Sequence, residues 1–121
     1  MRNLRSAKPR LTKLSRLLKR NFPDFYAEAK FQVGDDDQSL YARFGQYLAR
    51  SIETARAPKQ KINQGFNVLN KMAEAANDDP YVRTVFVSGP LEAIVDAPRA
   101  LAYARMKLSP VAQAYLDGLK E

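Results

Sequence analysis

The sequence predicts an all-α fold: a single-domain bundle of about six short helices, with a buried central helix near residues 80–96. Apolar residues recur three and four positions apart in most segments, which is the period of one face of a helix. Prolines and short polar turns separate these segments. The one stretch that is typical of a strand has no second strand with which to pair. With 121 residues, the chain has the length of one domain, residues 1–121.

A basic amphipathic helix is predicted at about residues 9–21. Its apolar face consists of leucines at helical spacing, namely Leu11, Leu14, Leu17 and Leu18. Pro9 suits the first turn of this helix, and Pro23 is expected to end it. The aromatic-rich stretch 22–31 is short and is assigned no helix, and residues 33–37 are expected to form a loop.

The next two helices have the clearest periodicity in the chain. Ser39 is expected to cap the first of them, which stops at Ala57-Pro58. Its shared apolar face is Leu40, Phe44, Leu48, Ser51, Ile52 and Ala55, and that of the second helix is Ile62, Phe66, Leu69, Met72, Ala73 and Ala76. The second helix is expected to end at the polar turn 77–80.

Residues 81–95 fit either a strand or a helix. The stretch is rich in β-branched and aromatic residues, as strands are, but these residues do not alternate with polar ones. As a helix, its apolar residues point all round, which indicates burial at the centre of the fold. Asp79 and Pro80 suit an N-cap and a first turn, and Gly89-Pro90 is expected to kink or split the helix.

Two short helices complete the predicted fold, at about residues 97–108 and 109–118. Each begins with a small residue followed by proline, which favours a helix start. The matching apolar faces predict one core, formed by Leu40, Phe44, Leu48, Phe66, Leu69, Val82, Phe86, Leu91 and Ile94.

The composition lacks the residue types that several kinds of catalytic and metal site use. The chain contains no Cys and no His, so it lacks thiolates, disulfides, the commonest general base and the commonest metal ligand. There is no glycine-rich phosphate loop and no nucleophile paired with a base, so we expect no enzyme, no catalytic residues, no metal and no cofactor. No run of eighteen apolar residues is present, and no membrane partner is expected.

Positive charge is concentrated at the N-terminus. Of the net charge of +7, residues 1–20 carry eight Lys and Arg without any acid, while the remainder is nearly neutral. Arg10, Lys13 and Arg16 are candidate partner-binding residues on this segment, although a solvated helix face is the interpretation that we favour. We expect no nucleic-acid partner for this segment, because it has no aromatic residue to stack on bases and no helix-turn-helix is recognisable.

Three further groups are candidates for contact with a partner. The acidic cluster Asp35, Asp36 and Asp37 is a poor match to a calcium-binding loop. The interpretation that we favour is that its negative charge stabilises the N-terminus of the following helix, and the alternative is a partner-binding patch. One polar stripe of the predicted helix that ends at the polar turn 77–80 contains Asn63, Asn67 and Asn70 together with Glu74 and Asn77. The interpretation that we favour is hydrogen bonding between helices, and the alternative is a strip that binds another protein. Arg43, Tyr47 and Arg50 are surface residues of the types that most often anchor interfaces.

Two stretches resemble a loosely defined group of small all-helical bacterial proteins. These are "LYARFGQYLARSIE" from Leu40 to Glu53 and "FNVLNKMAEAANDDPYVRTVFVSGPLEAI" from Phe66 to Ile94. The group commonly consists of immunity proteins encoded beside secreted antibacterial toxins, as in contact-dependent inhibition or type VI secretion. The resemblance implies a cytoplasmic protein that binds and occludes a cognate toxin domain. It carries over no binding residues, because immunity surfaces diverge with the toxin.

A second class stays open, that of a small basic nucleic-acid-associated or regulatory helical protein that uses the N-terminal helix. The sequence leaves the oligomeric state open as well.

Overall fold

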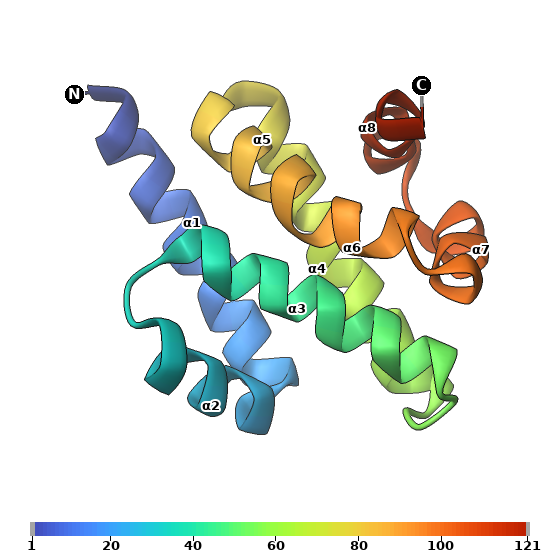
Figure 1. The fold of residues 1–121 in the computed structure, drawn as a ribbon. Coiled ribbons are helices and arrows are strands. Elements are labelled where there is room, and N and C mark those ends of the chain that lie inside the picture. Colours follow the sequence, from blue (N-terminus) through green and yellow to red (C-terminus); the bar gives the residue numbers. More distant parts are fainter. Residues whose placement is uncertain (1, 121) are drawn as a thin grey trace.

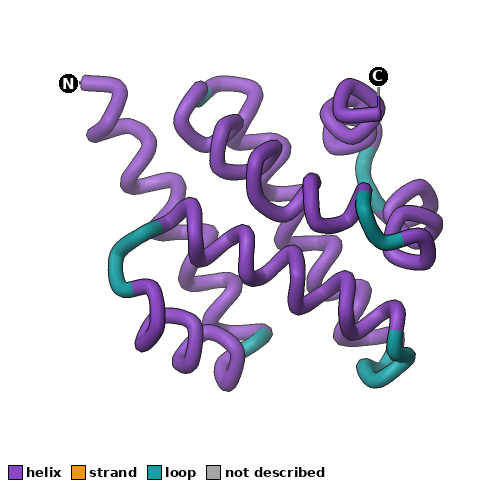
Figure 2. Tube along the Cα trace, in the orientation of Figure 1, coloured by secondary structure: helices purple, strands orange, loops and turns teal. Residues whose placement is uncertain are grey.

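The computed structural model describes the backbone of residues 2–120 and the side chains of residues 11–119. Within that part of the chain, all regular structure is helical and no strand is present, as predicted. Figure 2 shows that the connections are short. The elements are α1 (Arg2–Asn21), α2 (Pro23–Val33), α3 (Asp37–Glu53), α4 (Lys59–Asp78), α5 (Pro80–Phe86), η1 (Val87–Leu91), α6 (Glu92–Val95), α7 (Pro98–Lys107) and α8 (Pro110–Lys120).

The helices pack in two layers around one core. Figure 1 shows α3 crossing in front of α1 and α4, with α2 along its lower edge and the α5–α6 segment along its upper edge. α7 and α8 close the opposite end of the molecule. All nine residues of the predicted core are buried, each with at most 2% of its surface exposed. The predicted fold class and core are therefore confirmed.

α1 is amphipathic, as predicted, but it is longer than expected. It begins at Arg2, so Pro9 lies inside the helix and not in its first turn. Leu11, Leu14 and Leu18 are buried, and this apolar side faces α4 and α2. A partly buried hydrogen bond adds to the packing: the hydroxyls of Ser15 and Tyr41 lie 2.9 Å apart, which connects α1 with α3. Burial raises the pKa of Tyr41 well above its usual range.

The stretch that was assigned no helix in the sequence forms α2. Pro23 does not simply end α1; it is the first residue of the next helix, and Phe22 lies at the junction between the two. This arrangement needs no N–H from proline, because the first turn of a helix leaves its N–H groups unpaired. Gly34, with φ at +61°, ends α2 in a backbone conformation that favours glycine.

α3 begins and ends differently from the prediction. Asp36 and not Ser39 is its N-cap, and the Asp36 carboxylate accepts hydrogen bonds from the backbone N–H and the hydroxyl of Ser39 at 3.2 and 2.8 Å. The helix ends at Glu53, so Ala55 lies beyond it, exposed and at a positive φ of 53°, and does not belong to the apolar face.

The central helix is present at the predicted place. Asp79 caps α5 by accepting hydrogen bonds from the N–H groups of the first turn, and Pro80 follows it. The chain then runs through α5, η1 and α6 without leaving the helical conformation, and Gly89-Pro90 widens it into a π-helical turn instead of splitting it. Val82, Val85, Phe86, Leu91 and Ile94 are completely buried, so this helix contributes to the core as predicted. Its polar residues form one exposed side. The turn presses closely on α3, because a Cβ placed on Gly45 would lie 2.4 Å from the Cα of Pro90.

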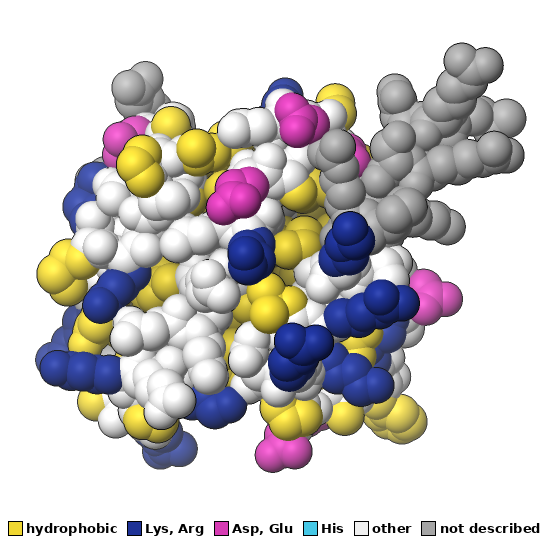
Figure 3. Space-filling view, turned by 180° about the vertical axis from the view of Figure 1, so that it is seen from behind, with side chains coloured by type: hydrophobic (Ala, Val, Ile, Leu, Met, Phe, Trp, Pro, Cys, Tyr) yellow, Lys and Arg dark blue, Asp and Glu magenta, His cyan; other side chains and the backbone are white. Residues whose placement is uncertain are grey.

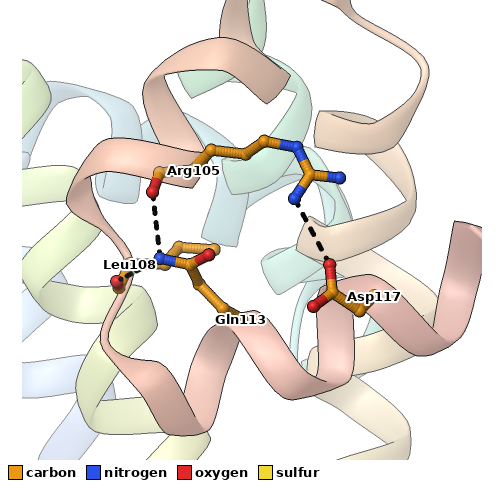
Figure 4. A network of polar contacts seen from close by, with 4 residues as sticks. All are labelled: Arg105, Leu108, Gln113 and Asp117. Atoms are coloured by element: carbon orange, nitrogen blue, oxygen red, sulfur yellow. Dashed lines mark hydrogen bonds and ion pairs between the residues drawn. The ribbon is translucent and has the colours of Figure 1, made fainter.

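Polar contacts hold the corner between α7 and α8 (Figure 4). The Gln113 side chain donates hydrogen bonds to the carbonyl oxygens of Arg105 and Leu108, at 2.9 and 3.1 Å. Arg105 and Asp117 form an ion pair at 3.3 Å. The Gln113 side chain thus satisfies carbonyls in the last turn of α7 and at its C-cap, which have no partners inside the helix.

Candidate partner-binding surface

Three candidate residues of α3 lie on one side of the helix. Arg43, Tyr47 and Arg50 are four and three positions apart, which places them in one row on an α-helix. The two arginines are exposed, and Tyr47 has 40% of its surface exposed. The row borders a hollow of about 300 Å³ between α3 and α2.

A second hollow of about 410 Å³ continues from the first toward the start of α4. The two hollows share Phe25, Tyr47 and Arg50. We call the combined feature the α2–α3 groove. It is lined by Phe22, Pro23, Asp24, Phe25, Glu28, Ala29, Gln32, Arg43, Gln46, Tyr47, Arg50, Ser51, Thr54, Arg56, Ala57, Pro58 and Lys61.

The floor of the α2–α3 groove is aromatic. Phe25 and Tyr47 lie with their ring centroids 4.9 Å apart, and Phe25 and Phe44 lie 5.6 Å apart. Phe22 packs edge-on against Phe44 at 5.2 Å, while the Lys61 ammonium lies 5.2 Å from the centre of the Phe22 ring. Such ring contacts fix the side chains against one another, so the groove is largely formed without a ligand.

The two rims of the groove carry opposite charge. The α3 rim has Arg43 and Arg50, whereas the α2 rim has Asp24 and Glu28. Arg43 donates one hydrogen bond to the side-chain oxygen of Gln32 across the groove. Over the part of the chain whose side chains are described, no carboxylate lies within 4 Å of either rim arginine. Most of the guanidinium donors of this rim therefore remain directed at solvent.

The three aspartates around the start of α3 have separate roles. Asp36 caps the helix, and the hydrogen bonds from Ser39 lower the pKa of its carboxyl group. Burial raises the pKa of Asp37, and the Tyr81 hydroxyl, which donates to Asp37 at 3.4 Å, partly opposes this effect. Asp35 pairs with Lys30 at 3.5 Å. The sequence analysis favoured negative charge at the start of this helix for the cluster, and it assigned the cap to Ser39 instead of Asp36.

The basic and acidic candidates of the N-terminal half meet in one place. A hollow of about 430 Å³ between α1 and α2 is lined by Arg16 and Lys19 together with Asp35 and Asp37. Lys13 is exposed on the same helix. Figure 3 shows Lys and Arg side chains gathered beside the N-terminal end of the molecule. The side chain of Arg10 lies outside the described residues.

The asparagine stripe divides into two parts. The Asn70 side chain accepts a hydrogen bond from the N–H of Ser109 at 2.8 Å and donates to the carbonyl of Lys107 at 3.3 Å. Asn77 accepts from the Tyr115 hydroxyl at 2.9 Å. These two amides connect α4 with α7 and α8, as the favoured interpretation of hydrogen bonding between helices predicts. Asn63 and Asn67 are exposed, and their role as partner-binding residues stays a prediction.

Sequence reasoning missed the α2 side of the groove. Phe22 and Phe25 were noted only as part of an aromatic-rich stretch, because no helix was assigned there. A signal was present: Pro23-Asp24 has the composition of a first helical turn, and Gly34 follows eleven residues later as a stop.

In the described residues, no group of three or more Asp, Glu, His or Cys is close enough to hold a metal ion. No helix of that part is long and apolar enough to cross a bilayer. No family model, no curated protein and no solved structure matches this chain.

Proposed function

We propose that this protein is an immunity-type inhibitor, which binds a cognate antibacterial toxin domain in the cytoplasm and occludes it without turnover. The observation that carries the proposal is the row of Arg43, Tyr47 and Arg50 along a groove with an aromatic floor. Arginine and tyrosine are the residue types that most often dominate the binding free energy of an interface. The resemblance of two stretches to immunity proteins supplies the kind of partner.

The size of the groove favours a protein partner. Its two hollows extend from α2 across α3 to the start of α4, and the groove is open along its length. A stable complex would bury roughly 1,200–2,000 Å² in total, which requires contact beyond the groove itself. The mixed-charge surface between α1 and α2, with Arg16 and Asp35, lies on the other side of α2 and can enlarge the contact.

Charge would act on the rate of association as well as on affinity. The net charge of +7 favours encounter with an acidic partner, and complementary patches fix the register of the complex. An acidic or mixed-charge toxin surface is therefore the partner that this protein fits best.

The test is a growth assay with a toxin gene from the same genomic neighbourhood. Cells that express the toxin domain alone should stop growing, and cells that also express this protein should grow and yield a complex of the two proteins on purification. Growth arrest in both strains, with no complex recovered, would refute the proposal.

A second candidate function rests on a separate observation. Lys13, Arg16, Lys19 and Arg20 of α1 are all exposed, and no described carboxylate lies within ion-pair distance of them. A helix of this kind can contact the phosphates of a nucleic acid. Binding to duplex DNA that discriminates between sequences and persists at physiological salt would favour this candidate over the inhibitor.

A further inference from the structure

The spacing of the charges along the α2–α3 groove carries information about the segment that binds there. We propose that the groove receives an amphipathic helix of the partner, which bears two carboxylates seven residues apart with an apolar side chain between them. This inference rests on the proposed function, since it describes the partner's side of the same interface.

The distance between the two arginines fits a helix better than a strand. Arg43 and Arg50 are seven residues apart on α3, so their Cα atoms are about 10 Å apart along the helix axis. Two residues seven apart on a partner helix have the same separation and face the same side. On an extended strand, residues that share a face are about 7 or 13 Å apart, and neither value matches.

The floor of the groove specifies the residue between the carboxylates. Tyr47 lies between the two arginines in the row, with its ring 4.9 Å from that of Phe25. Its exposed 40% is the part that a partner can cover. An apolar side chain three or four positions after the first carboxylate would meet this ring, because that spacing keeps it on the same face of the partner helix.

The opposite rim sets the orientation of the partner helix. Asp24 and Glu28 are four residues apart on α2 and line the groove from the other side. They repel the partner's carboxylates, which therefore face the α3 rim. A helix with acids on one edge and a basic residue on the other satisfies both rims at once, and it can do so in only one rotation about its own axis.

Two synthetic helical peptides of identical composition test the proposal. Both carry one glutamate, a leucine four residues later and a second glutamate, which stands at the seventh position after the first in the matched peptide. In the control peptide it stands at the fifth position, which turns it about 140° around the helix. Fluorescence anisotropy of labelled peptides measures binding to the full chain.

The matched peptide is expected to bind about threefold more tightly than the control, since only the second glutamate, and therefore one partly exposed ion pair, distinguishes them. The preference should disappear in the double variant Arg43→Gln/Arg50→Gln and persist in Lys71→Gln/Lys107→Gln, which removes two exposed charges elsewhere. Equal binding of the two peptides, a preference that survives in the arginine variant, or no binding of either peptide would overturn the proposal.

These results can be separated from those of the growth assay. Protection from the toxin without a peptide preference would leave the inhibitor function standing and would exclude the acidic helix. A peptide preference without protection would support binding of an acidic helix in the groove and would refute the proposal that the partner is a toxin domain.

Discussion

Replacing Gly45 by Ala tests the closest contact in the fold. A Cβ at this position would lie 2.4 Å from the Cα of Pro90 and 3.0 Å from the Pro90 carbonyl oxygen, whereas carbon atoms in contact normally lie about 3.5–4.0 Å apart. The atoms that would have to move belong to backbone, so α3 and η1 must separate by about 1 Å. Over-packing of this kind costs about 1–3 kcal/mol, and the extent of the overlap points to the upper end. The better helix propensity of Ala returns about 1 kcal/mol.

The net expectation for Gly45→Ala is a loss of about 2 kcal/mol in the free energy of unfolding, measured by urea denaturation. Gly118→Ala is the matched control, because Gly118 is also inside a helix and has no atom within 4 Å of the added Cβ. The control should be as stable as the parent or more stable, by up to about 1 kcal/mol. A Gly45→Ala variant that is as stable as the parent would show that the contact between α3 and η1 is not as close as described.

Three further predictions concern the core, the α7–α8 corner and the start of α3. Phe86→Ala should lower the free energy of unfolding by about 3–5 kcal/mol, because the ring is completely buried; urea denaturation that shows less than 1 kcal/mol would contradict this. Asn70→Ala should lower the free energy of unfolding by about 1–3 kcal/mol, because it leaves the N–H of Ser109 at the start of α8 unpaired. Asn67→Ala, on the exposed part of the same stripe, is the control and should change this free energy by less than about 0.5 kcal/mol. Asp36→Ala should be less stable than the parent at neutral pH, as measured by thermal melts. This difference in stability should shrink as the pH falls below 3.8 and through the lowered pKa of the native carboxyl group, because protonation removes the advantage of the charged cap. A stability difference that stays constant down to about pH 2 would refute the assignment of Asp36 as the cap.

The parts of the fold that the sequence predicts are those in which one helix face does the packing. α3 and α4 have a complete apolar face, and their buried residues follow the helical period. In α2, Ala29 is the one fully buried residue, so the pattern of apolar residues is too weak to indicate a helix. The π-helical turn depends on contact with Gly45, a residue more than forty positions earlier, and no local pattern reports such a contact.

The same reasoning explains which part of the candidate site was predictable. Arg43, Tyr47 and Arg50 share one row because α3 is a regular helix, and their spacing is visible in the sequence. The groove exists only because α2 supplies the second rim and Phe25. Asn70 is a different case, because its position in the polar stripe was visible, whereas its hydrogen bond to the corner between α7 and α8 depends on the tertiary fold.

Charge reversal on the α3 rim decides whether the α2–α3 groove binds the partner. The measurement is the dissociation constant for the toxin domain identified in the growth assay, determined for the parent, for Arg43→Glu/Arg50→Glu and for Lys71→Glu/Lys107→Glu. The second variant changes the net charge by the same amount at exposed positions outside the groove. We expect the arginine variant to bind at least about 100-fold more weakly than the parent, which corresponds to about 2.7 kcal/mol, because two attractive pairs become repulsive. The lysine variant should change the dissociation constant by less than about fivefold, because it alters only long-range electrostatic attraction, which salt screens. Equal weakening in both variants, or no weakening in the arginine variant, would contradict the assignment of the groove as the binding surface.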